Sequence, residues 1–438
     1  MRTQGAIRDS DVVDGLSIGY LKIFGVWGII NDYRTTGKKN FIIKFKIFVT
    51  LLLAVPYIFC QNLSYFMIRV DIQKATFLNL HTLPALQMCC KILIFWFRLD
   101  SQSRLYSLAK KDFIHVAEDK REEAAKIFRK ITTKANLLCY SAFLVDLSIT
   151  AFSIADPGIS VDYLLHGTGS MTAVVGGRQK IMGGWYPLPM ASWPYYEAIF
   201  VYESLLMIWS GVLLALYVSL FYQVLICLHA QFTVLNLQVS AIKIFPSIDG
   251  NRKNTYNRDI YSSLNKEQIY SFVRDHQRLL SYANELRSVY NPLVTIILGM
   301  GVFVLIIGVF QFLFGKATKP MFIFKFMLLL AYQGIEVSMF CFGSSSLETA
   351  VSAGDESSDL QFAIYSSDWY KEDIQFRRAV QMVMVGARKG VTLTAVRIYP
   401  VNVETIMAVS LNVFLDYANL GGREGLKAPL AWERPPTA

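Results

Sequence analysis

Apolar stretches of about 20 residues, separated by polar stretches, recur along the whole chain. This is the length that an α-helix needs to cross a hydrocarbon core of about 30 Å. Of the 438 residues, 53% are hydrophobic and only 17% are charged, whereas soluble proteins carry roughly 25% charged residues. Because soluble cores rarely repeat such stretches, the sequence predicts an all-α integral membrane protein with several transmembrane helices.

We expect seven transmembrane helices, with boundaries good to several residues. The third contains Asp146, and the seventh is interrupted by Asn402, Glu404 and Asp416. The fourth is long enough to extend beyond the membrane. The expected spans are 47–68, 77–97, 137–155, 198–228, 293–314, 321–342 and 401–420.

Lys and Arg alternate along the segments between these spans. They crowd into the N-terminal segment and into the loops after the second, fourth and sixth spans, and they are sparse in the other loops. Under the positive-inside rule the basic segments are cytoplasmic. The N-terminus is therefore expected in the cytoplasm and the C-terminus outside, an orientation that opposes a G-protein-coupled receptor.

Apolar residues also recur at helical spacing in the loop before the fifth span, between positions 265 and 290. This pattern predicts an amphipathic helix that leads directly into the span. The helix either lies on the membrane surface or packs against other cytoplasmic helices, and we favour packing.

Several classes of function lack their signals. The six cysteines fall within or at the edge of apolar segments, where a thiol usually packs, and the five histidines show no paired ligand spacing. No Gly-x-Ser-x-Gly elbow and no phosphate-binding glycine loop is present. We therefore expect no metal, no cofactor and no enzyme activity. The net charge of +10 reflects the loop asymmetry, so no nucleic-acid partner is expected.

The last hundred residues carry the most specific pattern, and an upstream segment adds to it. The pieces are 363–370 (AIYSSDWY), 377–378 (RR), 393–395 (LTA), 401–405 (VNVET), 183–188 (GGWYPL) and 194–197 (PYYE). In this spacing they resemble the C-terminal signature and the second extracellular loop of the insect odorant receptors, with moth-like, pheromone-receptor-like features. The resemblance covers residues 15–410.

The resemblance implies an olfactory receptor: the odorant-binding subunit of a heteromeric ligand-gated cation channel in sensory neurons. It further implies a volatile organic ligand, a heterotetramer with the family's coreceptor, and a multi-pass location in the plasma membrane of olfactory dendrites. A membrane solute transporter is the alternative, since carriers also keep charged residues in their spans, but we find no internal repeat.

The implied organisation follows the spans, with the seventh as the pore helix. Two departures stand in or near it: Phe414-Leu415 replaces a common Tyr-Ser pair, and Gly390 stands where proline is frequent. The last residues are unlike the family's short end and are either a divergent tail or a gene-model or splice artefact, which we favour. The segments are 1–46 (cytoplasmic), 47–228 (spans one to four), 229–292 (cytoplasmic loop and amphipathic helix), 293–342 (spans five and six), 343–400 (cytoplasmic anchor), 401–420 (pore helix) and 421–438 (atypical tail).

A neutral odorant would bind chiefly by apolar burial, with one or two hydrogen bonds for orientation. The family places its ligand pocket among spans two, three, four and six, toward the outside. Helix packing or interfacial anchoring is the alternative for each aromatic candidate. The ligand-binding candidates are Phe77, His81, Phe152, Tyr195, Tyr196, Phe200, Tyr202, Met207, Phe322 and Phe326, and the pore candidates are Asp416 and Leu420.

Ionisable residues inside spans are costly and therefore candidates for function. Asp146 could sit in a hydrated cavity, pair with Lys91 or be neutralised by protonation. For Lys91 the simpler expectation is that its stem extends toward the cytoplasmic interface. Glu336 in the sixth span leaves similar alternatives open.

Overall fold

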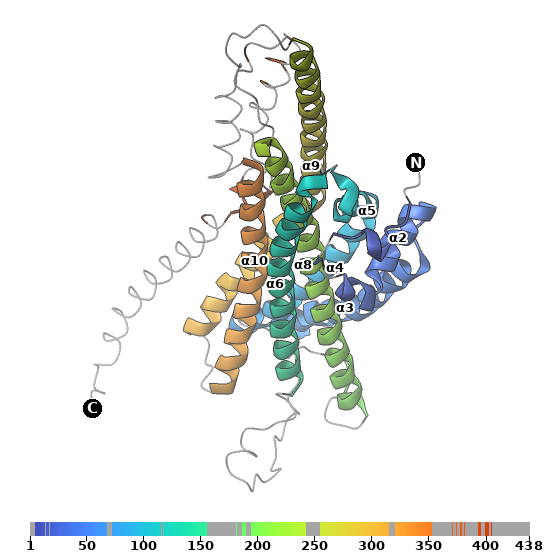
Figure 1. Ribbon diagram of the computed structural model, residues 1–438. Helices are drawn as coiled ribbons and strands as arrows, with labels where there is room; N and C mark the ends of the chain where they lie inside the picture. The colour runs from blue at the N-terminus through green and yellow to red at the C-terminus, as the bar shows by residue number, and fades with distance from the viewer. Residues whose placement is uncertain are drawn as a thin grey trace, which may run out of the picture.

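The computed structural model shows a bundle of long helices that lie roughly alongside one another (Figure 1). It describes residues 5–67 except 14 and 17, 72–155 except 115 and 117, 181, 186–189, 194–241, 255–314, 320–352, 370, 374, 377–378, 381, 393–395, 399–402 and 404. The long helices are α3 (Phe41–Met67), α4 (Ile72–Phe97), α6 (Arg121–Ala155), α8 (Tyr195–Ala241), α9 (Thr255–Phe314) and α10 (Pro320–Ser352).

Shorter helices precede α3 and fill the connection between α4 and α6. We call the end of the bundle that carries the α6–α8 connection the α6–α8 end. The shorter elements are η1 (Asp9–Asp11), α1 (Gly19–Ile23), α2 (Val26–Thr36), α5 (Leu99–Leu105), η2 (Tyr106–Ala109), η3 (Lys111–Phe113) and η4 (Glu118–Lys120).

Four helices in the described part of the chain are long and apolar enough to cross a membrane: α3, α6, α8 and α9. A fifth is reached if His81–Phe97 and Leu99–Ala109, bent by 73°, count as one broken span. The predicted first to fifth spans fall on these helices, and the sixth falls on α10. The predicted seventh span lies outside the described residues except at three positions near its start. The helical, membrane-type fold class is thus confirmed, whereas the count of seven stays a prediction.

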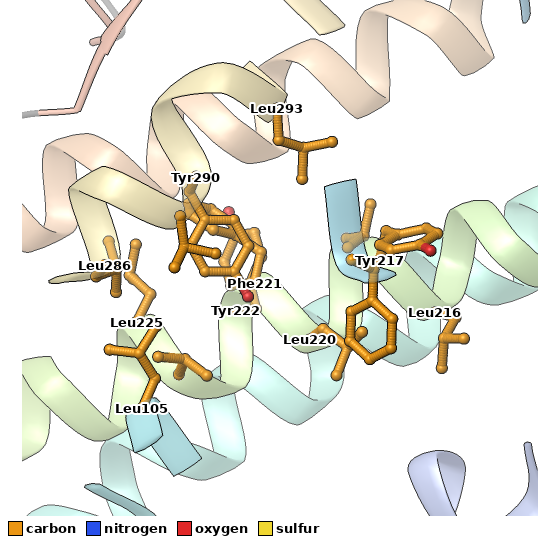
Figure 2. Close-up of a cluster of buried hydrophobic side chains, with 14 of the residues drawn as sticks. Leu105, Leu216, Tyr217, Leu220, Phe221, Tyr222, Leu225, Leu286, Tyr290 and Leu293 are labelled. Carbon is orange, nitrogen blue, oxygen red and sulfur yellow. The ribbon is translucent and has the colours of Figure 1, made fainter. Parts of the chain in front are cut away.

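Helix α8 lies at the centre of the bundle, and its most apolar window is almost wholly buried. Its Phe221 stacks on Phe340 of α10, with ring centroids 4.5 Å apart, and meets the edge of Tyr290 of α9 at 5.0 Å. Figure 2 shows Phe221 and Tyr290 among the leucines of this core. Aromatic pairs of this kind add about 0.5–1.5 kcal/mol each beyond the area they bury, so they fix α8 against α9 and α10.

Helix α9 runs for 60 residues without a break and passes through Pro292. It contains the whole predicted amphipathic helix, residues 265–290, so the expectation of a helix leading directly into a span is confirmed. The buried positions repeat at helical spacing, and this face packs against α5 and α8. Packing against neighbouring helices, which we favoured over a membrane surface, is what the structure shows. The buried residues of this stripe are Phe272, Leu279, Ala283, Leu286 and Val289.

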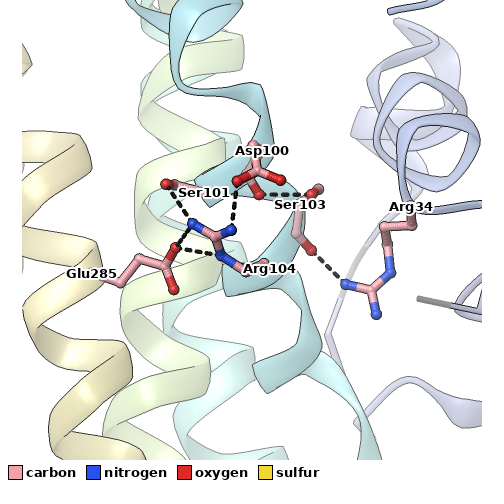
Figure 3. Close-up of polar contacts among 6 residues, drawn as sticks. All are labelled: Arg34, Asp100, Ser101, Ser103, Arg104 and Glu285. Atoms are coloured by element: carbon pink, nitrogen blue, oxygen red, sulfur yellow. Dashed lines mark hydrogen bonds and ion pairs between the residues drawn. The ribbon is translucent and has the colours of Figure 1, made fainter. Parts of the chain in front are cut away.

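A polar junction joins α5 to its neighbours on both sides (Figure 3). Arg104 of α5 pairs with Asp100 one turn earlier and with Glu285 of α9 at 2.6 Å. On the other side Arg34 of α2 donates to the backbone oxygen of Ser103. Burial lowers the pKa of Arg34, and the backbone carbonyls around it accept its N–H groups. The junction therefore fixes α2 and α9 to the same short helix.

The N-terminal segment is packed onto this same side of the bundle. The backbone N–H of Val13 donates to the oxygen of Ala109 at 2.8 Å, and the side chain of Asn136 donates to the oxygen of Gly15 at 2.6 Å. Gly15 has a φ of 87°, and a Cβ there would lie 2.5 Å from Thr132 Oγ1. Only glycine combines this left-handed backbone with such a close approach to α6.

A two-stranded antiparallel ladder, β1 (Thr394–Ala395) with β2 (Tyr399–Pro400), was not expected from the sequence. Asn291 of α9 holds it, because its amide nitrogen donates to Thr394 Oγ1 at 3.0 Å and its amide oxygen accepts the Thr394 N–H at 3.2 Å. The N–H of Leu393 also donates to Ser344 Oγ of α10 at 3.3 Å. The chain just before residue 401 is thus attached to two helices of the bundle.

Candidate functional site

A buried polar centre lies where α4 and α10 meet. Lys91 of α4 forms an ion pair with Glu336 of α10, and the two residues are 3% and 2% exposed. The other carboxylate oxygen of Glu336 accepts from Gln87 Nε2 at 3.0 Å and from Gln333 Nε2 at 3.3 Å. Both oxygens of the carboxylate are therefore occupied by donors, which a buried charge requires.

These four side chains come together because of helical spacing. Gln87 and Lys91 are four residues apart on α4, and Gln333 and Glu336 are three apart on α10, so each pair lies on one face of its helix. The facing surfaces then bring two donors from α4 to one carboxylate of α10. In an apolar bundle this network specifies how α4 and α10 align.

A second carboxylate is buried on α6. Asp146 lies against α8, where a Cβ on Gly211 would lie 2.6 Å from Asp146 Oδ2 and 3.1 Å from Thr150 Oγ1. Glycine at 211 thus leaves the space that the carboxylate occupies. These two buried carboxylates and the groups beside them therefore lie on α4, α6, α8 and α10, the helices that correspond to spans two, three, four and six.

The structure tests two of the expectations for the charged residues. The expected extension of Lys91 toward an interface is wrong, because its ammonium is buried on Glu336. The ion-pair partner of Lys91 is Glu336 rather than Asp146. Sequence reasoning missed Gln87 and Gln333, although an amide one turn from a charged residue inside an apolar span was the available signal.

The aromatic candidates are distributed along the same four helices, closer to the α6–α8 end. His81 lies ten residues before Lys91 on α4, and Phe152 lies six residues after Asp146 on α6; both are half-buried. On α8, Tyr196 stacks on Phe200 with centroids 6.2 Å apart, and Tyr195 is exposed. The side chains of Phe77, Phe322 and Phe326, and all of Asp416 and Leu420, lie outside the described part of the chain.

Tyr202 and Trp209 of α8 are directed toward α3. The hydroxyl of Tyr202 donates to the backbone oxygen of Leu53 at 2.5 Å, and Trp209 Nε1 donates to Thr50 Oγ1 at 2.9 Å. Met207 is half-buried and packs against the main core. The candidate residues on α8 therefore lie on different faces of the helix. The prediction from the sequence did not distinguish these faces.

The residue after Tyr202 on α8 is a buried carboxylate that was not among the candidates predicted from the sequence. Glu203 is 0% exposed and accepts the hydroxyl of Tyr186 at 2.7 Å and the N–H of Ile181 at 3.0 Å. Both donors belong to the segment between α6 and α8. Burial and the adjacent carboxylate raise the pKa of Tyr186, so its hydroxyl stays protonated as the donor. Glu203 thereby anchors the connecting segment to α8.

The chain is similar in sequence to a known protein family and in fold to solved structures. A family model described as "7tm Odorant receptor" matches residues 79–414. Among curated protein sequences, none matches the chain.

Two solved structures of the olfactory receptor OR5 from the insect Machilis hrabei have the same fold. One has a TM-score of 0.66 at 14% sequence identity and covers 92% of this chain and 97% of its own. The other, in complex with eugenol, has a TM-score of 0.70 at 15% identity and covers 93% of this chain and 99% of its own.

Proposed function

The chain belongs to the insect 7tm odorant receptor family, and on that premise we propose that it is the odorant-binding subunit of a heteromeric ligand-gated cation channel. The family match over residues 79–414 carries the proposal. In this proposal the partner is the family's coreceptor in a heterotetramer, and the location is the plasma membrane of olfactory dendrites. The buried charged centre also supports a functional role for the helix bundle, because charged residues inside a membrane are costly and usually serve the structure or a binding site.

The proposed topology has seven spans, a cytoplasmic N-terminus and an extracellular C-terminus. The contacts of Val13 with Ala109 and of Gly15 with Asn136 support part of it. They bring the N-terminal segment against the α4–α6 connection at Ala109 and against α6 at Asn136, which agrees with α3 and α4 both crossing the membrane. A tag at residue 1 that is stained on intact, unpermeabilised cells would contradict the orientation.

The proposed odorant pocket lies among α4, α6, α8 and α10, between the polar centre and the α6–α8 end. His81, Phe152 and Met207 are the best-supported contacts, since each is half-buried on one of these helices. Tyr202 is less favourable, because its hydroxyl is engaged by α3. The eugenol bound by OR5 supports a small neutral organic molecule as the ligand class. The remaining proposed contacts are Phe77, Tyr195, Tyr196, Phe200, Phe322 and Phe326.

The proposed pore is a separate site. Residues 401–420 would line it, with Asp416 attracting cations as a ring of carboxylates and Leu420 forming an apolar constriction one turn later. The attachment of the β1–β2 ladder to Asn291 supports a route from the bundle to this segment. Movement of α9 relative to α10 would reach the start of the proposed pore helix through that ladder.

The test combines currents with matched variants. We expect little ligand-evoked current from this subunit alone, and a cation current without a G-protein pathway when the coreceptor is coexpressed. Phe152→Ala and Met207→Ala should weaken sensitivity by about 5- to 150-fold, the equivalent of 1–3 kcal/mol of lost apolar contact. Phe59→Ala is the matched control, because Phe59 on α3 is 65% exposed on the outside of the bundle.

Surface biotinylation must accompany each dose-response curve, because a packing defect lowers surface protein instead. Unaltered sensitivity in both pocket variants at normal surface level would refute the pocket. Robust currents without the coreceptor would refute the heteromer, and substrate uptake without current would indicate a transporter.

A further inference from the structure

One amide is fully buried inside the bundle. Gln61 of α3 is 0% exposed, and neither its amide nitrogen nor its amide oxygen has a hydrogen-bond partner among the described residues. In a lipid-embedded bundle no bulk water reaches such a group. Buried polar side chains are nearly always satisfied by protein or by a bound molecule, so the amide of Gln61 calls for an occupant.

The neighbours of Gln61 on its own helix do not serve it. Tyr57 and Ser64, one turn away on either side, are also fully buried and lie on the same face of α3. The hydroxyl of Ser64 donates to the backbone oxygen of Gln61 at 2.5 Å, which leaves the side-chain amide unsatisfied. The polar face of α3 thus points into the protein at the α6–α8 end of the bundle.

Polar groups of α8 and of the segment before it lie beside α3 near this face. Tyr202 of α8 donates to the α3 backbone at Leu53, one turn before Tyr57. The hydroxyl of Tyr186 donates to Glu203, the next residue on α8. The hydroxyls of Tyr186 and Tyr202 are therefore engaged by other groups and do not serve the amide of Gln61.

We propose that Gln61 marks a binding site at the α3–α8 contact for one small, neutral, hydroxyl-bearing molecule, either water or a small alcohol. A hydroxyl is the simplest group that satisfies both amide atoms, because it donates to Oε1 while accepting from Nε2. A neutral ligand fits a neutral amide. Gln61 belongs to α3, which is not one of the four helices of the proposed odorant pocket, so this inference does not depend on the proposed function.

The experiment uses the purified full-length protein in detergent and a diazirine-bearing octanol as the photoreactive probe. We expect labelling of the α3 peptide around Gln61, competition by octanol and no competition by octane. Gln61→Leu should reduce the labelling roughly tenfold, as expected for the loss of two hydrogen bonds. Gln61→Met, which keeps the side-chain length, is the second variant if the first does not fold.

Melting temperatures distinguish the two sources of the hydroxyl. Gln231→Leu is the reference, because the amide of Gln231 is buried and donates to the Leu108 oxygen at 3.0 Å. If water is the occupant, labelling is absent and Gln61→Leu lowers the melting temperature as Gln231→Leu does. Labelling that persists in the Gln61 variants, or a melting temperature raised by Gln61→Leu without labelling, overturns the proposal.

Discussion

The ion pair between Lys91 and Glu336 makes a sharp prediction about stability. Lys91→Met removes the cation and leaves the Glu336 carboxylate buried, with only Gln87 and Gln333 as donors. Breaking a buried pair by removing one partner costs about 3–5 kcal/mol, most of it the cost of the uncompensated charge. We expect a large loss of surface protein and of thermal stability in Lys91→Met, and a comparable loss in Glu336→Gln.

The double variant decides whether pairing is the cause. Lys91→Met with Glu336→Gln removes both charges, so its loss of stability should be smaller than the sum of the two single losses by at least about 2 kcal/mol. The assay is the unfolding of purified protein in detergent, followed by surface biotinylation in cells. Lys130→Met is the matched control, because Lys130 is exposed on α6. A loss of stability in the double variant equal to the sum of the two single losses would refute the pairing. Each loss would then reflect only the changed side chain on its own helix.

Three further predictions concern other contacts. Gly211→Ala forces a Cβ to within 2.6 Å of Asp146 Oδ2, so we expect a loss of about 1–3 kcal/mol, measured by thermal unfolding and relieved by adding Asp146→Ala. Asn291→Ala removes both hydrogen bonds to Thr394 and should cost about 1–3 kcal/mol. The measurement is proteolytic cleavage near Thr394, which should become faster; an unchanged rate of cleavage would refute the attachment. Arg104→Met should cost less than about 1 kcal/mol, because the ion pairs of Arg104 are partly exposed, and a larger loss of thermal stability would contradict this.

Local apolar length predicted the membrane helices well, because each of α3, α6, α8 and α9 contains a window that meets the membrane requirement by itself. It failed at the ends of helices. Helix α6 begins at Arg121, well before its expected span at 137, because its first turns are charged and carry no hydropathy signal. The amphipathic half of α9 was found because its buried positions repeat at helical spacing.

The site could be predicted only as types of residue on particular spans. Lys91 and Glu336 are 245 positions apart, and no local pattern says which of two carboxylates a lysine will meet. The same holds for Tyr202, whose direction toward α3 depends on how α8 is rotated in the bundle. Glu203 was overlooked although it is a carboxylate inside the predicted fourth span; its donors, Tyr186 and Ile181, could not be predicted, because they come from a connecting segment whose path the sequence does not specify.

The position of the N-terminal segment constrains the order in which the chain can mature. Its contacts with Ala109 and Asn136 cannot form until those residues have left the ribosome, by which time α3 and α4 have been synthesised. Ile7, Val12 and Val13, all buried in the finished protein, therefore stay in contact with solvent or a chaperone until then. A bulky fusion at residue 1 would act on this late docking step, so its expected effect is a loss of surface protein and not a change in ligand sensitivity.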